Sequence, residues 1–283
     1  MPVYNGERFI AFAIESILAQ TYKHFELFIV NDNSSDATCE IIEAYKKRAP
    51  KKIHLIHLKK RQGAFGAMNV AMKYIKGEFI AAMDSDDVSH PQRLQKEVEF
   101  MLKNPDAVVV GTFARIIDKN GNIVGKKVFG TSHKEIYSSF FTVHSIVHPS
   151  CMIKRRMLPE KDNLYKDEFG VSDDYFTFFT LFHLGKFSNI PEYLLDYRIH
   201  SDNSSLQNLK NKFFTTVKIR LLAVKDLGYK PSLVEMLKFF AQIVFVSLVP
   251  EKILLKLYFY IKGIHISKDL TETVTVRTAV EYA

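Results

Sequence analysis

The first ninety residues alternate between helical and strand patterns, and this alternation restricts the fold more than any other feature of the chain. Apolar residues recur at helical spacing in some stretches and form short uninterrupted runs in others. The expected helices cover 6–20, 36–50 and 66–75, and the expected strands cover 25–30, 53–58 and 79–83. Strands that alternate with helices are typical of a sheet with helices on its faces. We therefore expect an α/β fold with a Rossmann-like mixed sheet flanked by helices.

The chain beyond residue 90 follows a less regular pattern. The expected elements are a helix over 91–103 and strands over 107–112 and 113–118, with a hairpin turn at Asn120-Gly121. From Leu206 the pattern is mostly helical, which predicts a C-terminal helical extension. A polar tail follows from Ser267, to which we assign no structure.

The composition indicates a folded protein of one large or two small domains, because 47% of the 283 residues are hydrophobic and 25% are charged. The two cysteines, Cys39 and Cys151, are too few for a disulfide framework, and neither lies in a zinc-binding or redox pattern. The N-terminus shows no secretory signal pattern. We therefore expect a cytoplasmic location.

The net charge of +8 is concentrated toward the C-terminus. Residues 206–262 contain ten lysines and arginines against three acidic residues. Such a segment suits nucleic acid, an anionic membrane surface or a phosphate-bearing substrate, and a solvated helical face is the simplest alternative. Basic-aromatic motifs are scarce in the first half of the chain, so we expect no nucleic-acid partner, whose binding would depend steeply on salt.

Two apolar runs lie within this basic segment. The first, over 233–249, is interrupted by Lys238 and Gln242 and is shorter than the roughly 20 apolar residues that span a bilayer. The second covers 253–261 and is flanked by lysines. Together they favour helices that lie in the interface of an anionic membrane, and packing against the rest of the protein is the alternative.

An acidic cluster, Asp84-Ser85-Asp86-Asp87, follows the expected strand over 79–83. Side chains two residues apart on a strand face the same way, so Asp84 and Asp86 are expected to meet at the carboxyl edge of the sheet, where open α/β sheets bind ligands. Clustered carboxylates repel one another unless a cation lies between them, and oxygen ligands favour Mg²⁺ or Mn²⁺. A capped turn before the next helix is the alternative.

A second polar loop follows the strand over 25–30. Asp32 is expected to point into the same crevice as the acidic cluster, where it could accept a hydrogen bond from a nucleobase or a ribose. Asp36 is expected to cap the next helix. Capping explains Asp36 on its own but does not explain Asp32.

Taken together, these motifs resemble those of glycosyltransferase family 2. In chain order they are Pro2-Val3-Tyr4-Asn5-Gly6, the loop 31–36, the segments 63–69 and 77–87, and Tyr197-Arg198-Ile199-His200. Each motif alone is weak, but the ordered set covers about the first 205 residues and is specific. The resemblance implies a GT-A fold, a nucleotide-sugar donor and inversion at the anomeric carbon. The expected parts are a catalytic domain over 1–205, with a nucleotide-binding half over 1–88 and an acceptor half over 89–205, and a basic helical extension over 206–283.

The resemblance also implies roles for single residues in the donor site. The donor-binding residues it implies are Pro2, Tyr4, Asn5, Asp32, Asp84 and Arg198. Tyr4 is expected against the nucleobase, Asp32 in a hydrogen bond to it, and Asp84 near the nucleoside. Asp86 is expected to bind the Mg²⁺ or Mn²⁺ that bridges the diphosphate. His200 is expected to contact the metal or the phosphates, and a surface loop histidine is the alternative.

The proton acceptor is expected in the segment 171–176, which matches an acidic pair that precedes a helix in the family. Asp174 falls at the position of the general base, which takes the proton from the acceptor hydroxyl as that oxygen attacks the sugar. The metal stabilises the charge that develops on the leaving diphosphate. Without the resemblance, Ser172-Asp173-Asp174 is an ordinary helix cap.

The expected function is therefore that of a metal-dependent, inverting hexosyl- or N-acetylhexosaminyltransferase that builds a surface polysaccharide or a lipid-linked glycan. Asn31 and Asn33 depart from the residues usual in their loop, so base preference stays open, with a UDP-sugar as the expected donor and a glycan or lipid-linked molecule as the acceptor. The expected location is cytoplasmic, peripheral on the inner face of the plasma membrane.

The start of the sequence is unusual, because a doubly wound sheet needs an apolar strand that leads into Pro2-Val3-Tyr4-Asn5. Burial of three or four large apolar side chains in that strand would contribute roughly 1.5–3 kcal/mol each. We therefore expect a truncated or misassigned start. A second possible function follows: a non-catalytic module that binds nucleotide sugars and is inactive through loss of the first strand.

Overall fold

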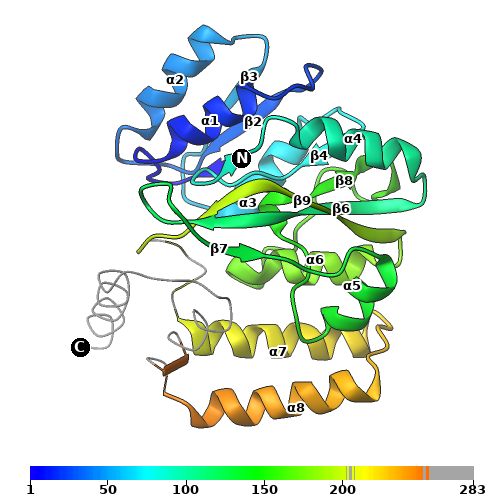
Figure 1. The fold of residues 1–283 in the computed structure, drawn as a ribbon. Helices are drawn as coiled ribbons and strands as arrows, with labels where there is room; N and C mark the ends of the chain where they lie inside the picture. The colour runs from blue at the N-terminus through cyan, green and yellow to red at the C-terminus, as the bar shows by residue number, and fades with distance from the viewer. Residues whose placement is uncertain (202, 204–205, 207, 251–252, 255–283) are drawn as a thin grey trace.

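The computed structural model describes residues 1–201, 203, 206, 208–250 and 253–254. Its strands form two sheets (Figure 1). The first is parallel, in the order β1 (Pro2–Val3), β2 (Leu27–Asn31) and β3 (Ile53–His57). The second has the order β4 (Phe79–Ala81), β8 (Met152–Lys154), β6 (Ala107–Ile117), β9 (Lys186–Arg198) and β5 (Val88–Ser89), with β7 (Ile123–Lys127) paired to β6. The mixed α/β architecture expected from the sequence is confirmed.

The predicted alternation in the first half is confirmed as well. The helices are α1 (Ile10–Leu18), α2 (Thr38–Arg48), α3 (Gly63–Met72) and α4 (Arg93–Lys103). The apolar stripe of α1 is buried, and its Ile10 and Ile14 pack in one cluster with Ile29 of β2 and Ile42 of α2. Asp36 was predicted as the N-cap of α2, but the N-cap is Ala37; Asp36 lies one residue earlier and accepts a hydrogen bond from the N–H of Thr38.

One continuous strand, β6, replaces the two strands predicted over 107–112 and 113–118. The apparent break corresponds to a shift in the register between β6 and β9 at Thr112 and Phe113. Such an irregularity bends a strand without ending it. The hairpin from β6 to β7 turns where it was predicted, with Gly121 at φ 91° and the carboxylate of Asp118 accepting bonds from two N–H groups of the turn.

The remaining helices form layers below the larger sheet (Figure 1). They are α5 (His133–Phe140), α6 (Asp173–Leu181), α7 (Leu209–Lys225) and α8 (Leu233–Leu248), with single 3₁₀ turns at η1 (His148–Ser150), η2 (Arg155–Met157) and η3 (Gly170–Ser172). The predicted C-terminal helices are therefore present. The apolar run over 253–261 and the polar tail lie outside the described residues, apart from Ile253 and Leu254.

A single aromatic core joins α7 and α8 to the second sheet and its helices. Phe239 of α8 lies against Phe141, with ring centroids 5.1 Å apart, and Tyr229 lies 4.9 Å from Phe179 of α6. Ile219 of α7 is fully buried in the same cluster. The helical extension thus completes a core that the residues before it share. The division into domains at residues 88 and 205 stays a prediction.

The two sheets are separate because β1 is two residues long and pairs with β2 only, among the strands of the described residues. A cavity of about 620 Å³ lies beside it, lined by residues from β2 and β4. Its lining is largely apolar and includes Leu27, Phe28, Ile80 and Met83. The single doubly wound sheet implied by the sequence pattern is therefore divided between β1 and β4.

Candidate active site

Three carboxylates meet in the acidic loop, residues 84–87, which joins β4 to β5. One oxygen from each of Asp84, Asp86 and Asp87 lies within 4.8 Å of the others. The cluster was predicted, but the reason given for it was wrong, because β4 ends at Ala81 and the three residues lie in a loop rather than on a strand face. The turn of the loop, not strand alternation, brings them together.

Asp87 is the buried member of this cluster. Its Oδ1 accepts a hydrogen bond from the N–H of Arg198 at 2.8 Å, and its Oδ2 has no hydrogen-bond partner among the described residues. Burial and the nearby negative charges of Asp86 and Asp84 raise the pKa of Asp87, and burial together with Asp86 raises the pKa of Asp84 to about 7. Buried oxygens without donors fit a bound cation, which favours the charged carboxylates.

His200 lies directly against this cluster. Its Nε2 is 3.0 Å from Oδ2 of Asp86, and Nδ2 of Asn203 donates to the same oxygen at 3.1 Å. The His200 ring is buried and packs 4.9 Å from the ring of Phe9. The structure therefore brings together the two residues predicted to bind metal, and His200 is not a surface loop histidine. Asn203 has no sequence signal that marks it.

Arg198 lies behind the acidic loop rather than in an open crevice. Its Nε donates to the backbone oxygen of Asp86 at 2.8 Å, and its Nη1 donates to the backbone oxygen of Asp118 at 3.1 Å. Its guanidinium lies 4.8 Å from the ring centroid of Phe9. The side chain is buried. Arg198 therefore holds the conformation of the loop that carries Asp86 and adds positive charge beside the carboxylates.

Asp32 is also buried, at the end of β2. Its two carboxylate oxygens accept hydrogen bonds from the N–H groups of Gln62 at 2.7 Å and Gly63 at 2.8 Å. These groups begin α3, and an anion at a helix N-terminus is favoured by the helix dipole. The contacts also explain why α3 begins at Gly63, three residues before its predicted start.

The turn after β1 places Tyr4 and Asn5 beside this position. Tyr4 is 41% exposed, and the guanidinium of Arg61 lies 3.8 Å from its ring centroid. Asn5 adopts a φ of 48°, and its Oδ1 accepts a hydrogen bond from the N–H of Ser35 at 2.9 Å. Pro2 is buried in β1. The predicted donor-binding residues of the N-terminal turn thus lie next to the loop that carries Asp32.

Asp174 lies in the first turn of α6, and its electrostatic surroundings connect it to the acidic loop. Burial raises the pKa of Asp174 to about 7, and the negative charges of Asp84 and Asp173 act in the same direction. Lys127 of β7 lowers the pKa of Asp174 and also that of Asp84. The charge of the predicted donor residue Asp84 thus contributes to the raised pKa of the predicted base.

His144 is a further neighbour of Asp174 that the sequence did not indicate. Its Nδ1 is 3.7 Å from Oδ2 of Asp174, and its ring packs 5.1 Å from that of Tyr175. Oδ1 of Asp174 accepts a hydrogen bond from the N–H of Tyr175 at 2.8 Å. Neither His144 nor Lys127 belongs to a spacing pattern, so only the tertiary structure identifies them.

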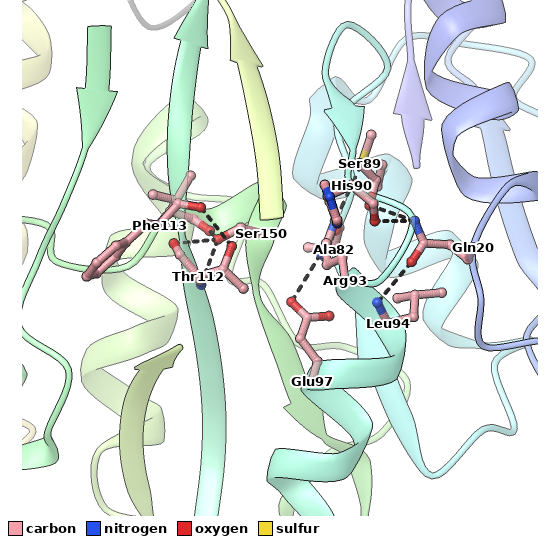
Figure 2. A network of polar contacts seen from close by, with 12 residues as sticks. Gln20, Ala82, Ser89, His90, Arg93, Leu94, Glu97, Thr112, Phe113 and Ser150 are labelled. Atoms are coloured by element: carbon pink, nitrogen blue, oxygen red, sulfur yellow. Dashed lines mark hydrogen bonds and ion pairs between the residues drawn. The ribbon is translucent and has the colours of Figure 1, made fainter. Parts of the chain in front are cut away.

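A buried polar network holds the residues on either side of the acidic loop (Figure 2). Nη2 of Arg93 donates to the oxygen of Ala82 at 2.7 Å, and its Nε donates to Glu97 at 3.1 Å. Nε2 of Gln20, at the end of α1, donates to the oxygen of His90 at 2.8 Å. Because Ala82 precedes the acidic loop and His90 follows it, this network fixes both of its ends.

Comparison with known protein families relates the chain to enzymes that transfer sugars. The family model described as Glycosyl transferase family 2 matches residues 1–161. An uncharacterized glycosyltransferase of Methanocaldococcus jannaschii is 35% identical over 216 residues, which cover 75% of this chain and 73% of that protein. The Escherichia coli UDP-Glc:alpha-D-GlcNAc-diphosphoundecaprenol beta-1,3-glucosyltransferase WfgD is 34% identical over 182 residues, 64% of this chain and 67% of that protein.

Solved structures share the architecture at lower identity. Staphylococcus aureus TarS 1–349 in complex with UDP-GlcNAc superposes with a TM-score of 0.63 at 20% identity, covering 78% of this chain and 65% of that one. The mannosyltransferase PcManGT of Pyrobaculum calidifontis, in complex with GDP-Man and Mn²⁺, superposes with a TM-score of 0.58 at 14% identity, covering 100% of this chain and 86% of that one. At these identities the likeness is one of fold, and it agrees with the GT-A architecture expected from the sequence.

Proposed function

The chain belongs to glycosyl transferase family 2, and from this membership we propose that it is an inverting, metal-dependent glycosyltransferase that uses a UDP-sugar. The observation that carries the proposal is the cluster of Asp84, Asp86 and Asp87, with one oxygen of each within 4.8 Å of the others and Nε2 of His200 3.0 Å from Oδ2 of Asp86. The acidic loop and His200 are suited to hold a sugar diphosphate through a cation, and Asp174 is suited to accept a proton. Inverting transfer needs both on opposite sides of the sugar carbon.

The acidic loop fits a divalent cation. Asp86 and His200 would hold Mg²⁺ or Mn²⁺, with Asp84 and the partnerless oxygen of Asp87 next to them. When bound, such an ion stabilises the negative charge that develops on the leaving diphosphate. The Mn²⁺ in the complex of the Pyrobaculum mannosyltransferase supports a divalent cation as the ion bound by this loop.

The chain's own residues orient the donor and the acceptor. Tyr4 offers an exposed ring face to the nucleobase, and Asp32 retains lone pairs for a hydrogen bond to it. Asp84 would contact the nucleoside, while Pro2, Asn5 and Arg198 shape the turn and the loop around it. Asp174 would take the proton from the acceptor hydroxyl, for which a pKa of about 7 is well matched to neutral pH.

The proposed acceptor is a glycan or a lipid-linked glycan, and the proposed transferred group is a hexose or an N-acetylhexosamine. The printed name of WfgD specifies a glucose donor and a diphosphoundecaprenol-linked acceptor, and a second E. coli relative, 34% identical, is named for O-antigen biosynthesis. An acceptor of this kind requires the enzyme to work at a membrane. We therefore place the protein in the cytoplasm, peripheral on the inner face of the plasma membrane.

The test is release of UDP by the purified full chain supplied with UDP-glucose or UDP-N-acetylglucosamine. We expect UDP release with Mn²⁺ or Mg²⁺, loss of release with a chelator, and loss in Asp86→Ala. Asp106→Ala is the matched control, because Asp106 is an exposed carboxylate paired with Lys186. Donor binding without turnover in the wild-type chain would instead support the non-catalytic module, and release that is indifferent to chelator would contradict metal dependence.

A further inference from the structure

The strongest unexplained feature outside the site is an apolar surface on α8. The α8 outer face comprises Leu233, Val234, Leu237, Phe240, Val244, Phe245 and Leu248. Their side chains are between 45% and 78% exposed. These residues follow the helical period, so they lie together on one side of the helix. Contiguous exposed apolar surfaces of this kind mark interaction sites.

The orientation of this face is set by the opposite side of α8. Glu235 is buried and accepts a hydrogen bond from the hydroxyl of Thr142, and Phe239 is buried against Phe141. Gln242 accepts a hydrogen bond from Nη1 of Arg220 at 2.9 Å. Rotation of the helix to hide its apolar side would break all of these contacts. The helix is the outermost layer of the described molecule, on the side away from the smaller sheet (Figure 1).

Basic residues border the α8 outer face. Lys230 is exposed just before α8, and Nζ of Lys210 lies 3.4 Å from the backbone oxygen of Ser247 at its far end. Lys238 is exposed on its flank, where its Nζ pairs with Glu235 at 2.7 Å. The one acidic residue of α8, Glu235, is buried. Among the residues that the structure describes, the exposed acidic residue nearest to α8 in the chain is Asp226, at the end of α7. Over 208–250 the chain has seven basic residues against two acidic ones.

We propose that the α8 outer face docks in the interface of an anionic lipid membrane, with the bordering lysines at the headgroups. The 16 residues of α8 span about 24 Å, less than the roughly 30 Å hydrocarbon core, and no helix among the described residues is long and apolar enough to cross a membrane. An apolar side with a basic border suits a helix that lies in the interface. A second copy fits less well, because symmetric pairing of this face would bring like-charged lysines together.

The experiment is flotation of the full chain with vesicles, without donor or acceptor. We expect binding to phosphatidylcholine vesicles that contain about one third phosphatidylglycerol, and weaker binding to phosphatidylcholine alone or at high salt. Leu237→Ser combined with Phe240→Ser should lower the partition coefficient at least about tenfold, because two large side chains no longer enter the lipid. Leu102→Ser combined with Tyr74→Ser is the matched control, since both side chains are more than half exposed elsewhere.

The lysines are tested separately. Lys230→Gln should weaken binding to the anionic vesicles about fivefold, the factor that corresponds to about 1 kcal/mol, and should leave binding to neutral vesicles unchanged. Circular dichroism and thermal melting verify that each variant is folded. UDP release by the same variants should stay at the wild-type level, so failure of membrane docking and failure of the proposed chemistry are distinguishable.

Two results would overturn the proposal. One is equal flotation of the wild-type chain and the Leu237→Ser, Phe240→Ser variant. The other is a dimer in sedimentation velocity that this variant converts to a monomer, which would identify a second copy as the occupant of the α8 outer face.

Discussion

At the scale of single residues, the carboxyl of Asp174 is held in a site that disfavours its charge. Burial is the main cause, and Asp84 and Asp173 add to it, so the pKa of Asp174 rises to about 7. A base must be deprotonated to act, so activity is lost as pH falls through that pKa. The activity of the proposed enzyme should therefore change with pH near neutrality. A base with the usual pKa of an aspartate would not give this dependence.

The pH profile of transfer checks this base. We expect kcat/KM of the wild-type chain to fall about tenfold per pH unit below about 7, and Asp174→Asn to lose about 10²–10⁴-fold in activity together with this acid limb. In the control Asp173→Asn the limb should persist and move to lower pH, because one negative charge near Asp174 is removed. A normal limb in Asp174→Asn would contradict its role as the base.

The buried pair of Arg93 and Glu97 leads to a stability prediction. Both side chains have no exposed surface, and Arg93 also holds the oxygen of Ala82 before the acidic loop. Glu97→Ala leaves the guanidinium buried without its partner, which should lower the free energy of unfolding by about 3–5 kcal/mol. Urea unfolding measures the change. Glu99→Ala, at an exposed position on the same helix, should stay within about 0.5 kcal/mol, and equal effects of the two variants would count against the pair.

At the scale of helices and strands, one buried arginine of α7 forms hydrogen bonds with both α6 and α8. Nε of Arg220 lies 3.2 Å from the hydroxyl of Tyr175 on α6, and its other nitrogens reach Gln242 of α8 and the oxygen of Thr142. Arg220→Met keeps the aliphatic bulk and removes these donors. We expect a loss of about 1.5–3 kcal/mol in urea unfolding.

Lys225→Met on the exposed side of the same helix is the control for this prediction, and it should change stability by less than about 0.5 kcal/mol. If Arg220→Met proved equally neutral, the contacts of Arg220 would not hold α7 in place.

Local sequence patterns predicted the presence of the helices and strands more accurately than the points at which they begin, end or bend. The four helices before residue 104 and the strands β2, β3 and β4 were predicted from spacing, whereas the two-residue strands β1 and β5 were not. The continuity of β6 was missed, because a register shift and a turn interrupt an apolar run in the same way. The start of α3 was misplaced because its N-terminal N–H groups bond to Asp32, about thirty residues earlier.

The residues of the candidate site were also predicted only in part. Asp84, Asp86 and His200 were predicted as a group and lie together, whereas Lys127, His144 and Asn203 were not predicted. The missed residues lack a repeated spacing and reach the site through tertiary packing. A sequence pattern reflects contacts between residues that are close along the chain. It does not show which residues from distant strands and turns lie near a carboxylate of the site.

At the scale of the whole molecule, the helical extension is part of the main core. Ile219, Tyr229 and Phe239 are buried in the cluster that contains Phe140 and Phe179. A chain that ends after Asn208 would expose this cluster to water. We expect it to lose a cooperative thermal transition and to bind a hydrophobic dye, because removal of each large core side chain costs about 3–5 kcal/mol.

A chain that ends after Pro250, with both helices retained, is the control for that experiment. Calorimetry and dye fluorescence measure the two chains side by side. A normal cooperative transition in the chain that ends after Asn208 would support residues 1–205 as an independent domain.

The hydroxyl of Tyr175 has a consequence for how such enzymes diversify. Tyr175 follows Asp174 in the chain, and its hydroxyl bonds both to the oxygen of Phe140 and to Arg220 of the extension. A C-terminal segment taken from a relative would need a hydrogen-bond donor in the place of Arg220, or Tyr175, the neighbour of the proposed base, would lose its contact with α7. Exchange of C-terminal segments among such enzymes is therefore restricted, because it alters contacts next to the proposed base.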